Sequence, residues 1–220
     1  MNRRLLLLKY HDAMLEALGP SHWWPGETPF EIALGAILTQ NTNWTNVEKA
    51  LANLRDRDLL DPARLDSLPL ERVEELIRPA GFFRIKARRI GHFMSFLRQT
   101  CDLELERLSS WDPAMLRPRL LQVSGIGPET ADSILLYALG FPVFVVDAYT
   151  LRILSRHNLV PSNARYQELQ AFFMDSLPHD PALFNEFHAL IVRTAKTWCR
   201  RNHQNCRACP LGPVLDHGNP

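Results

Sequence analysis

The residue usage of this chain favours helices over sheets. Leucine occurs 35 times and valine 9 times in 220 residues. Leucine is a good helix former, whereas β-branched valine is enriched in strands. Three Asp-Pro pairs add to this preference, because an aspartate caps a helix well when proline is the first helical residue. The sequence therefore predicts an all-α fold with helices that begin after Asp61, Asp112 and Asp180.

Helical spacing of apolar residues, together with turn residues, predicts further helices. They cover residues 3–18, 29–38, 45–54, 71–77, 85–97, 128–139, 148–156 and 166–177. We expect Pro118 to kink or split the helix that starts at Pro113, because proline lacks the backbone N–H that a helix interior uses. Residues 212–220 are expected to form a loose tail.

Charge and apolar content exclude several classes of protein. The 25 basic residues nearly balance the 24 acidic ones, so any attraction to nucleic acid must come from local patches. The 46% of hydrophobic residues suffices for a packed core. The longest apolar run, residues 134–146, is too short to span a bilayer, and Lys9 ends the N-terminal leucine run before it reaches the length of a secretory signal. We expect a cytoplasmic protein.

The segment Gly125-Ile126-Gly127 separates two apolar helical segments. Glycine lets the backbone approach a ligand closely, and the helix that begins at Pro128 presents unpaired N–H groups that favour an anion. Such a hairpin between helices lets the backbone approach a phosphate closely. An ordinary turn between two helices is the alternative interpretation.

Asp147 ends an apolar run and opens a predicted helix. Its carboxylate is well placed to cap that helix. A carboxylate kept ionised by a helix N-terminus is also suited to stabilise a cation that develops during a reaction. The position alone leaves both roles open.

Two polar or aromatic stretches near the N-terminus are candidates for contact with a nucleic acid base. The neighbours Trp23 and Trp24 cannot both be buried on one helix face, so one is available to stack on a flat, preferably cationic, base. Core packing is the alternative for a tryptophan. Gln40 follows an apolar helix, where its amide could fill the gap left by a displaced base.

Three cysteines lie close together near the C-terminus. The spacing of Cys199, Cys206 and Cys209 predicts a metal centre in a reducing compartment rather than a set of disulfides. A fourth cysteine is missing after Cys209, and Cys101 is distant in the sequence.

Taken in order, residues 38–42, 81–87, 123–131 and 146–147, together with the cysteine spacing, resemble the endonuclease III superfamily of DNA glycosylases. The resemblance implies a two-lobed, all-α helix-hairpin-helix glycosylase fold. A DNA-binding cleft would lie between a six-helix barrel at residues 28–140 and an N/C-terminal helical lobe of residues 1–27 plus 141–220. It also implies a 4Fe-4S cluster and a monomer that binds damaged double-stranded DNA.

The resemblance also assigns roles to single residues. Asp147 matches the essential catalytic aspartate, and Gln40 matches the residue that wedges into the duplex after base flipping. The hairpin that grips a phosphate, and that could hold a monovalent cation, corresponds to Gly125, Ile126, Gly127 and Thr130. Glu129 stands where bifunctional members carry a Schiff-base lysine. Because a carboxylate cannot form an imine, AP lyase activity is expected to be absent.

Within the superfamily, residues 23–25, 39–42, 78–82, 129–132 and 146–149 most resemble the 3-methyladenine DNA glycosylases of endonuclease III type. This implies that Trp23 and Trp24 line the base pocket and that Lys196 matches a lysine modified by carbon dioxide. Some of these members lack a cluster, and Leu215 stands here where the fourth ligand belongs.

The expected function is hydrolysis of the N-glycosidic bond of a flipped alkylated purine in base excision repair. Two alternatives stay open at this point. One is excision of oxidised or mismatched pyrimidines, and the other is a non-catalytic module that binds DNA lesions or junctions.

Overall fold

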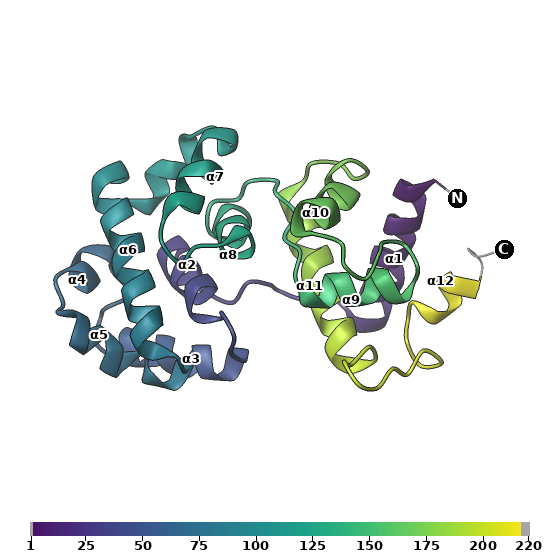
Figure 1. Cartoon of the computed structure of the whole chain (residues 1–220), viewed down its shortest axis with the longest axis horizontal. Helices are drawn as coiled ribbons and strands as arrows, with labels where there is room; N and C mark the ends of the chain where they lie inside the picture. Colours follow the sequence, from purple (N-terminus) through teal and green to yellow (C-terminus); the bar gives the residue numbers. More distant parts are fainter. Residues whose placement is uncertain (1, 217–220) are drawn as a thin grey trace. The chain divides into compact units, whose positions relative to one another are not determined.

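A computed structural model describes residues 2–216 of the chain (Figure 1). These residues form helices joined by turns and loops, with no strand among them beyond an isolated bridge between Cys199 and Gln204. The all-α prediction is therefore confirmed. The chain divides into two compact units, one spanning Trp24–Phe141 and the other combining the flanking stretches Met1–Trp23 and Pro142–Pro220. The barrel and lobe bounds expected from the resemblance stay a prediction.

The unit that spans Trp24–Phe141 is built around one buried helix, α2. Its helices are α2 (Pro29–Leu38), α3 (Trp44–Arg55), α4 (Pro62–Asp66), α5 (Leu70–Leu76), α6 (Phe83–Cys101), α7 (Pro113–Gln122) and α8 (Pro128–Ser133). Turns of 3₁₀ type cover Arg78–Ala80 and Leu105–Ser110, and a π-helical turn covers Ile134–Ala138. Eight of the ten α2 residues are buried, because α3, α6, α8 and the π-helical turn pack around it.

The other unit joins the first helix of the chain to the last ones. Its helices are α1 (Arg3–Leu18), α9 (Ala148–Arg156), α10 (Tyr166–Met174), α11 (Pro181–Thr197) and α12 (Gly212–Asp216). Helix α11 packs against both α1 and α9 (Figure 1). Aromatic rings fill the core: Phe144 stacks on Phe173 at 3.9 Å between centroids, and both meet Phe187 edge-on. This core anchors the segment that leads into Asp147.

The helix starts predicted from Asp-Pro pairs are confirmed. Asp61, Asp112 and Asp180 each accept a backbone N–H through a side-chain oxygen, and each is followed by proline at the first helical position. In each case the aspartate and the N–H group that it accepts are at most three residues apart, so the cap depends only on the local sequence.

Three local expectations are wrong. The expected split at Pro118 is wrong, because helix α7 continues through it from Pro113 to Gln122 and proline removes only the bond to the carbonyl four residues earlier, whereas the expected kink stays a prediction. The single helix expected over residues 128–139 changes to a π-helical turn at Ile134. The expected tail begins with helix α12 over Gly212–Asp216, and residues 217–220 lie outside the described part of the chain.

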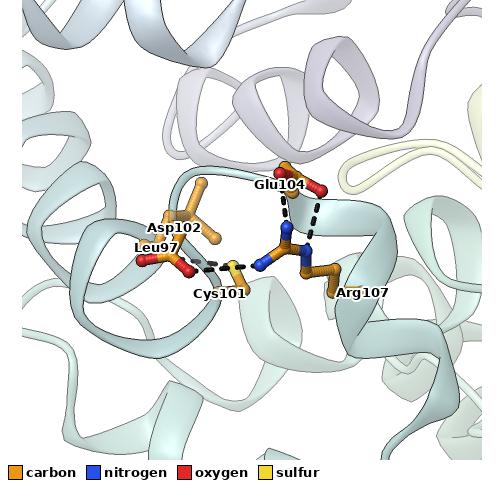
Figure 2. Close-up of polar contacts among 5 residues, drawn as sticks. All are labelled: Leu97, Cys101, Asp102, Glu104 and Arg107. Carbon is orange, nitrogen blue, oxygen red and sulfur yellow. Dashed lines mark hydrogen bonds and ion pairs between the residues drawn. The ribbon is translucent and has the colours of Figure 1, made fainter.

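A cluster of polar contacts closes the C-terminal end of α6 (Figure 2). The thiol of buried Cys101 donates to the carbonyl of Leu97, and Asp102 adopts a left-handed conformation with φ of 53°. Arg107 donates to Glu104 at 2.6 and 2.7 Å and to Asp102 at 3.1 Å. The cluster holds the turn that reverses the chain after the longest helix. Cys101 is thus a structural residue of this unit.

Buried charges in the same unit are compensated. Asp132 is fully buried and accepts two hydrogen bonds from the guanidinium of Arg117, at 2.6 and 2.9 Å. The ammonium of Lys86, also buried, donates to the carbonyls of Leu38 and Ala80 at 2.8 and 2.7 Å. Burial, and secondarily Arg89, lowers the pKa of Lys86 to about 8. Among the described residues, no helix is long and apolar enough to cross a membrane.

Arg117→Met is expected to lower the free energy of unfolding by about 3 kcal/mol, because it removes the two hydrogen bonds that the guanidinium donates to the buried carboxylate of Asp132. Arg72→Met is the matched control, since it breaks a solvent-exposed ion pair with Glu75 and should cost about 0.5 kcal/mol or less. Urea unfolding of both variants measures the difference. Equal effects would contradict the assigned role of the buried pair.

Candidate active site

The carboxylate of Asp147 is held at the N-terminus of α9. Its Oδ1 atom accepts hydrogen bonds from the backbone N–H of Tyr149 at 2.9 Å and of Thr150 at 2.8 Å, and from the Thr150 hydroxyl at 3.0 Å. The Thr150 hydroxyl in turn accepts the Asp147 backbone N–H, which completes a capping box. The predicted cap is therefore confirmed. The cap uses only Oδ1, so Oδ2 takes no part in it.

The second oxygen of Asp147 faces a histidine that the sequence reasoning did not single out. Nε2 of His188, on α11, lies 3.6 Å from Oδ2, and the side chains of Asp147 and His188 are only 11% and 6% exposed. Burial of the carboxyl group raises the pKa of Asp147. The contact with His188 and the hydrogen bonds from Thr150 lower it by more, so this pKa lies below its ordinary value. The structure thus keeps a mostly buried carboxylate ionised.

Lys196 lies close to the same helix start. Its ammonium is 5.7 Å from the centre of the Tyr149 ring, and the guanidinium of Arg152 is 4.9 Å from the same centre. Lys196 therefore lies beside the ring of Tyr149, the second residue of α9. The modification of Lys196 and its role in substrate binding stay predictions.

Trp24 takes part in an aromatic group of the unit that spans Trp24–Phe141. Its ring meets Trp44 edge-on at 5.1 Å and lies at 5.0 Å from Tyr137, tilted by 33°. Its indole nitrogen also lies against Gly35, where an added Cβ would be 3.1 Å away. Tyr137 comes from the π-helical turn, an irregularity that is frequent at functional sites. Trp23 belongs to the other unit and is half-buried.

The hairpin occupies residues 123–127, between α7 and α8. Gly125 has φ of 90°, a conformation that L side chains rarely adopt, and Gly125 and Gly127 are exposed whereas Ile126 is buried. An added Cβ at Gly127 would meet no atom within 4 Å. The backbone at Gly127 is therefore open on the side where a Cβ would lie.

Gln40 joins this hairpin to the end of α2. Its amide nitrogen donates to the Gly125 carbonyl at 3.1 Å and to the Thr130 hydroxyl at 2.8 Å. Its amide oxygen accepts a hydrogen bond from Arg89 on α6. Three of the residues assigned to DNA binding thus lie together in one unit, with Arg89 as an additional member.

The three C-terminal cysteines line one small cavity. Its volume is about 20 Å³, and Cys199, Cys206 and Cys209 lie on its wall with His157. Among residues 2–216, no set of three or more metal-ligating side chains is arranged to hold a metal ion. The cysteine loop as it stands therefore does not fit an iron-sulfur cluster, and the predicted fourth-ligand position lies at side chains the structure does not describe.

Arginines of α9 attach the cysteine loop to the helix that Asp147 starts. Arg152 donates to the carbonyl of Cys199 at 2.7 Å. Arg156 donates to the Cys199 sulfur at 3.2 Å and to the carbonyls of Arg200 and Arg201 at 2.9 and 2.8 Å. These contacts fix the loop through side chains of this unit.

Four residues of these neighbourhoods were missed from the sequence: His188, Arg89, Trp44 and Tyr137. A signal existed for His188, which interrupts the apolar face of α11, where eight other residues are buried. The remaining three gain their roles only through contacts between segments far apart in the chain.

Comparison with known proteins agrees with this arrangement. Residues 34–179 match the HhH-GPD superfamily of base excision DNA repair proteins. A protein of Methanocaldococcus jannaschii, whose provisional name describes a DNA repair glycosylase, is 42% identical over 211 residues, which cover 96% of each chain.

Two solved structures have the same fold. The crystal structure of H. pylori 3-methyladenine DNA glycosylase (MagIII) bound to 1,N6-ethenoadenine matches with a TM-score of 0.76 and 28% identity, over 89% of this chain and 98% of that one. A non-covalent complex of endonuclease III with DNA matches with a TM-score of 0.81 and 23% identity, over 99% and 95%. The chain therefore belongs to the HhH-GPD superfamily of base excision DNA repair proteins and is a DNA glycosylase of that type.

Proposed function

We propose that this protein is a monofunctional DNA glycosylase that hydrolyses the N-glycosidic bond of a flipped alkylated purine such as 3-methyladenine. The observation that carries the proposal is the mostly buried carboxylate of Asp147, kept ionised at the start of α9. The substrate class is supported by the aromatic surroundings of Trp24 and by the 28% identical glycosylase whose title names 3-methyladenine.

The leaving group determines what the protein must supply. A 3-methylated purine carries a positive charge, so the bond between C1′ and the base breaks with its electron pair leaving on the base, which becomes neutral. A cation then develops on the sugar, and the ionised carboxylate of Asp147 stabilises it. Water adds to C1′ and gives up a proton, for which the same carboxylate is an acceptor. Little acid catalysis is needed for such a base.

Aromatic rings suit the recognition of a cationic base. A methylated purine stacks on indole and phenol faces, with an added attraction between its charge and the ring electrons. We propose that Trp24 serves this purpose with Trp44 and Tyr137, and that Trp23 contributes a further ring. Neutral oxidised pyrimidines would instead need polar contacts and activation of the leaving group.

The hairpin is proposed to bind a DNA phosphate. The open backbone at Gly127 and the exposed backbone at Gly125 allow close approach of an oxygen anion, and a monovalent cation held by hairpin carbonyls stays part of the proposal. The side chain of Gln40 would fill the gap that the flipped base leaves in the duplex.

Asp147→Asn is expected to reduce excision of 3-methyladenine by about 100-fold or more, because the amide cannot stabilise the sugar cation. The asparagine oxygen still accepts the N–H groups that cap α9, so the fold and the affinity for DNA with an abasic-site analogue should be retained. Asp180→Asn, a second helix cap in the same unit, is the control and should excise normally. Normal excision by Asp147→Asn would refute the assignment.

Borohydride treatment during turnover is expected to trap no covalent adduct with DNA. Glu129 cannot form an imine, and the lysine of its unit with a lowered pKa, Lys86, is enclosed by the carbonyls of Leu38 and Ala80. Denaturing gel electrophoresis of the treated mixture detects an adduct as a shifted DNA band. Such a band would contradict the monofunctional mechanism.

His188→Asn is expected to raise the pKa of Asp147, since the contact with His188 is one cause of its low value. The ionised form would then be lost at higher pH in the variant than in the wild type. A titration of the ¹³C-labelled carboxyl groups by NMR measures this, with Asp147→Asn identifying the resonance. The exposed His179→Asn is the control. An unchanged titration in His188→Asn would show that His188 does not influence the carboxylate.

A further inference from the structure

Gln40 has no unused hydrogen on its side-chain amide. Both hydrogens of Nε2 are accounted for by the Gly125 carbonyl and the Thr130 hydroxyl, and Oε1 accepts from Arg89. Three segments far apart in the sequence meet at this one amide: the end of α2, the helix α6, and the hairpin with the helix α8 that follows it.

The orientation of this amide has one solution. The guanidinium of Arg89 only donates, so it must face the amide oxygen, and the carbonyl of Gly125 only accepts, so it must face the amide nitrogen. A flipped amide would place donor against donor and acceptor against acceptor. Arg89 therefore determines that the Gln40 nitrogen points to the hairpin.

Arg89 also covers the hairpin directly. A Cβ added at Gly125 would lie 2.3 Å from Cγ and 2.8 Å from Cδ of Arg89, so the aliphatic part of this side chain lies on the glycine. One turn along α6, Nδ1 of His92 is 3.1 Å from the carbonyl of Ser124. Helix α6 thus contacts two consecutive hairpin residues and Gln40 at once.

From these contacts we infer that Arg89 is a positioning residue that joins Gln40 and the hairpin into one coupled DNA-binding element. Within this element, the hairpin binds a DNA phosphate and Gln40 fills the gap in the duplex. The two are linked by the hydrogen bonds from Gln40 to Gly125 and Thr130. Gln40 engages DNA with its nitrogen only by exchanging a bond to Gly125 or Thr130. The inference rests on the proposed DNA-binding role of the hairpin.

A double-mutant cycle on DNA affinity tests the coupling. Arg89→Met keeps an unbranched aliphatic side chain over Gly125 but removes the donor, and Gln40→Met keeps the side-chain length but removes the amide. Each variant is expected to weaken binding to a duplex with one abasic-site analogue by about 10-fold, and the double variant by about 10-fold rather than about 100-fold. Fluorescence anisotropy at one fixed salt concentration provides the dissociation constants.

Controls separate the coupling from a loss of charge or of fold. Arg88→Met removes an exposed arginine one residue away, and its effect should multiply with that of Gln40→Met. Thr130→Val removes a different partner of Gln40 with little change of volume, and it should be non-additive with Gln40→Met in the same way as Arg89→Met. If Arg89→Met melts at a lower temperature than the wild type, this second cycle still tests whether Gln40 and the hairpin are coupled, and multiplying effects would overturn the coupling.

The possible results are distinct. A double variant weakened by about 100-fold would overturn the coupling, and so would Arg89→Met that binds as the wild type does. Both of these outcomes leave the proposed function intact. A wild-type protein that does not bind the abasic duplex would overturn the proposed function and the coupling together.

Discussion

The proposed chemistry depends on a carboxylate held at the N-terminus of a helix. Three donors converge on Oδ1 of Asp147, and the cost of burying the charge is offset by these bonds and by the contact of Oδ2 with His188. The aromatic core around Phe144 and Phe173 fixes the preceding segment, so the carboxylate has one position. We therefore propose that the carboxylate that caps α9 is also the charge that stabilises the sugar cation.

In the other unit, the preorganised part is the hairpin with its supports. Gly125 adopts a conformation that favours glycine, and Arg89 and Gln40 hold the residues around it. If the hairpin binds a DNA phosphate as proposed, a loop held in this way loses less entropy on binding. Lys86 joins the C-terminal end of α2 to the turn at Ala80 through hydrogen bonds to the carbonyls of Leu38 and Ala80. These bonds position the segment that leads to Gln40.

Local sequence signals predicted the parts of this molecule that depend on near neighbours. Local sequence predicts the helix starts at Asp61, Asp112 and Asp180 and the cap at Asp147. Each depends on hydrogen bonds between residues at most three positions apart. The continuity of α7 through Pro118 and the π-helical turn depend on packing, and no local pattern signalled them. His188, Arg89 and Trp44 acquire their roles from partners between 20 and 49 positions away. The spacing of the three C-terminal cysteines indicated that they lie together, and they line one cavity. The spacing could not indicate the size of that cavity.

We propose that this glycosylase removes alkylated purines, and the identity of the released bases tests this proposal. The most direct measurement is mass spectrometry of the bases released by the purified protein from methylated DNA and from duplexes that contain single oxidised or mismatched pyrimidines. We expect release of 3-methyladenine from methylated DNA and no release of pyrimidines. Release of an oxidised or mismatched pyrimidine, with 3-methyladenine left in place, would contradict it.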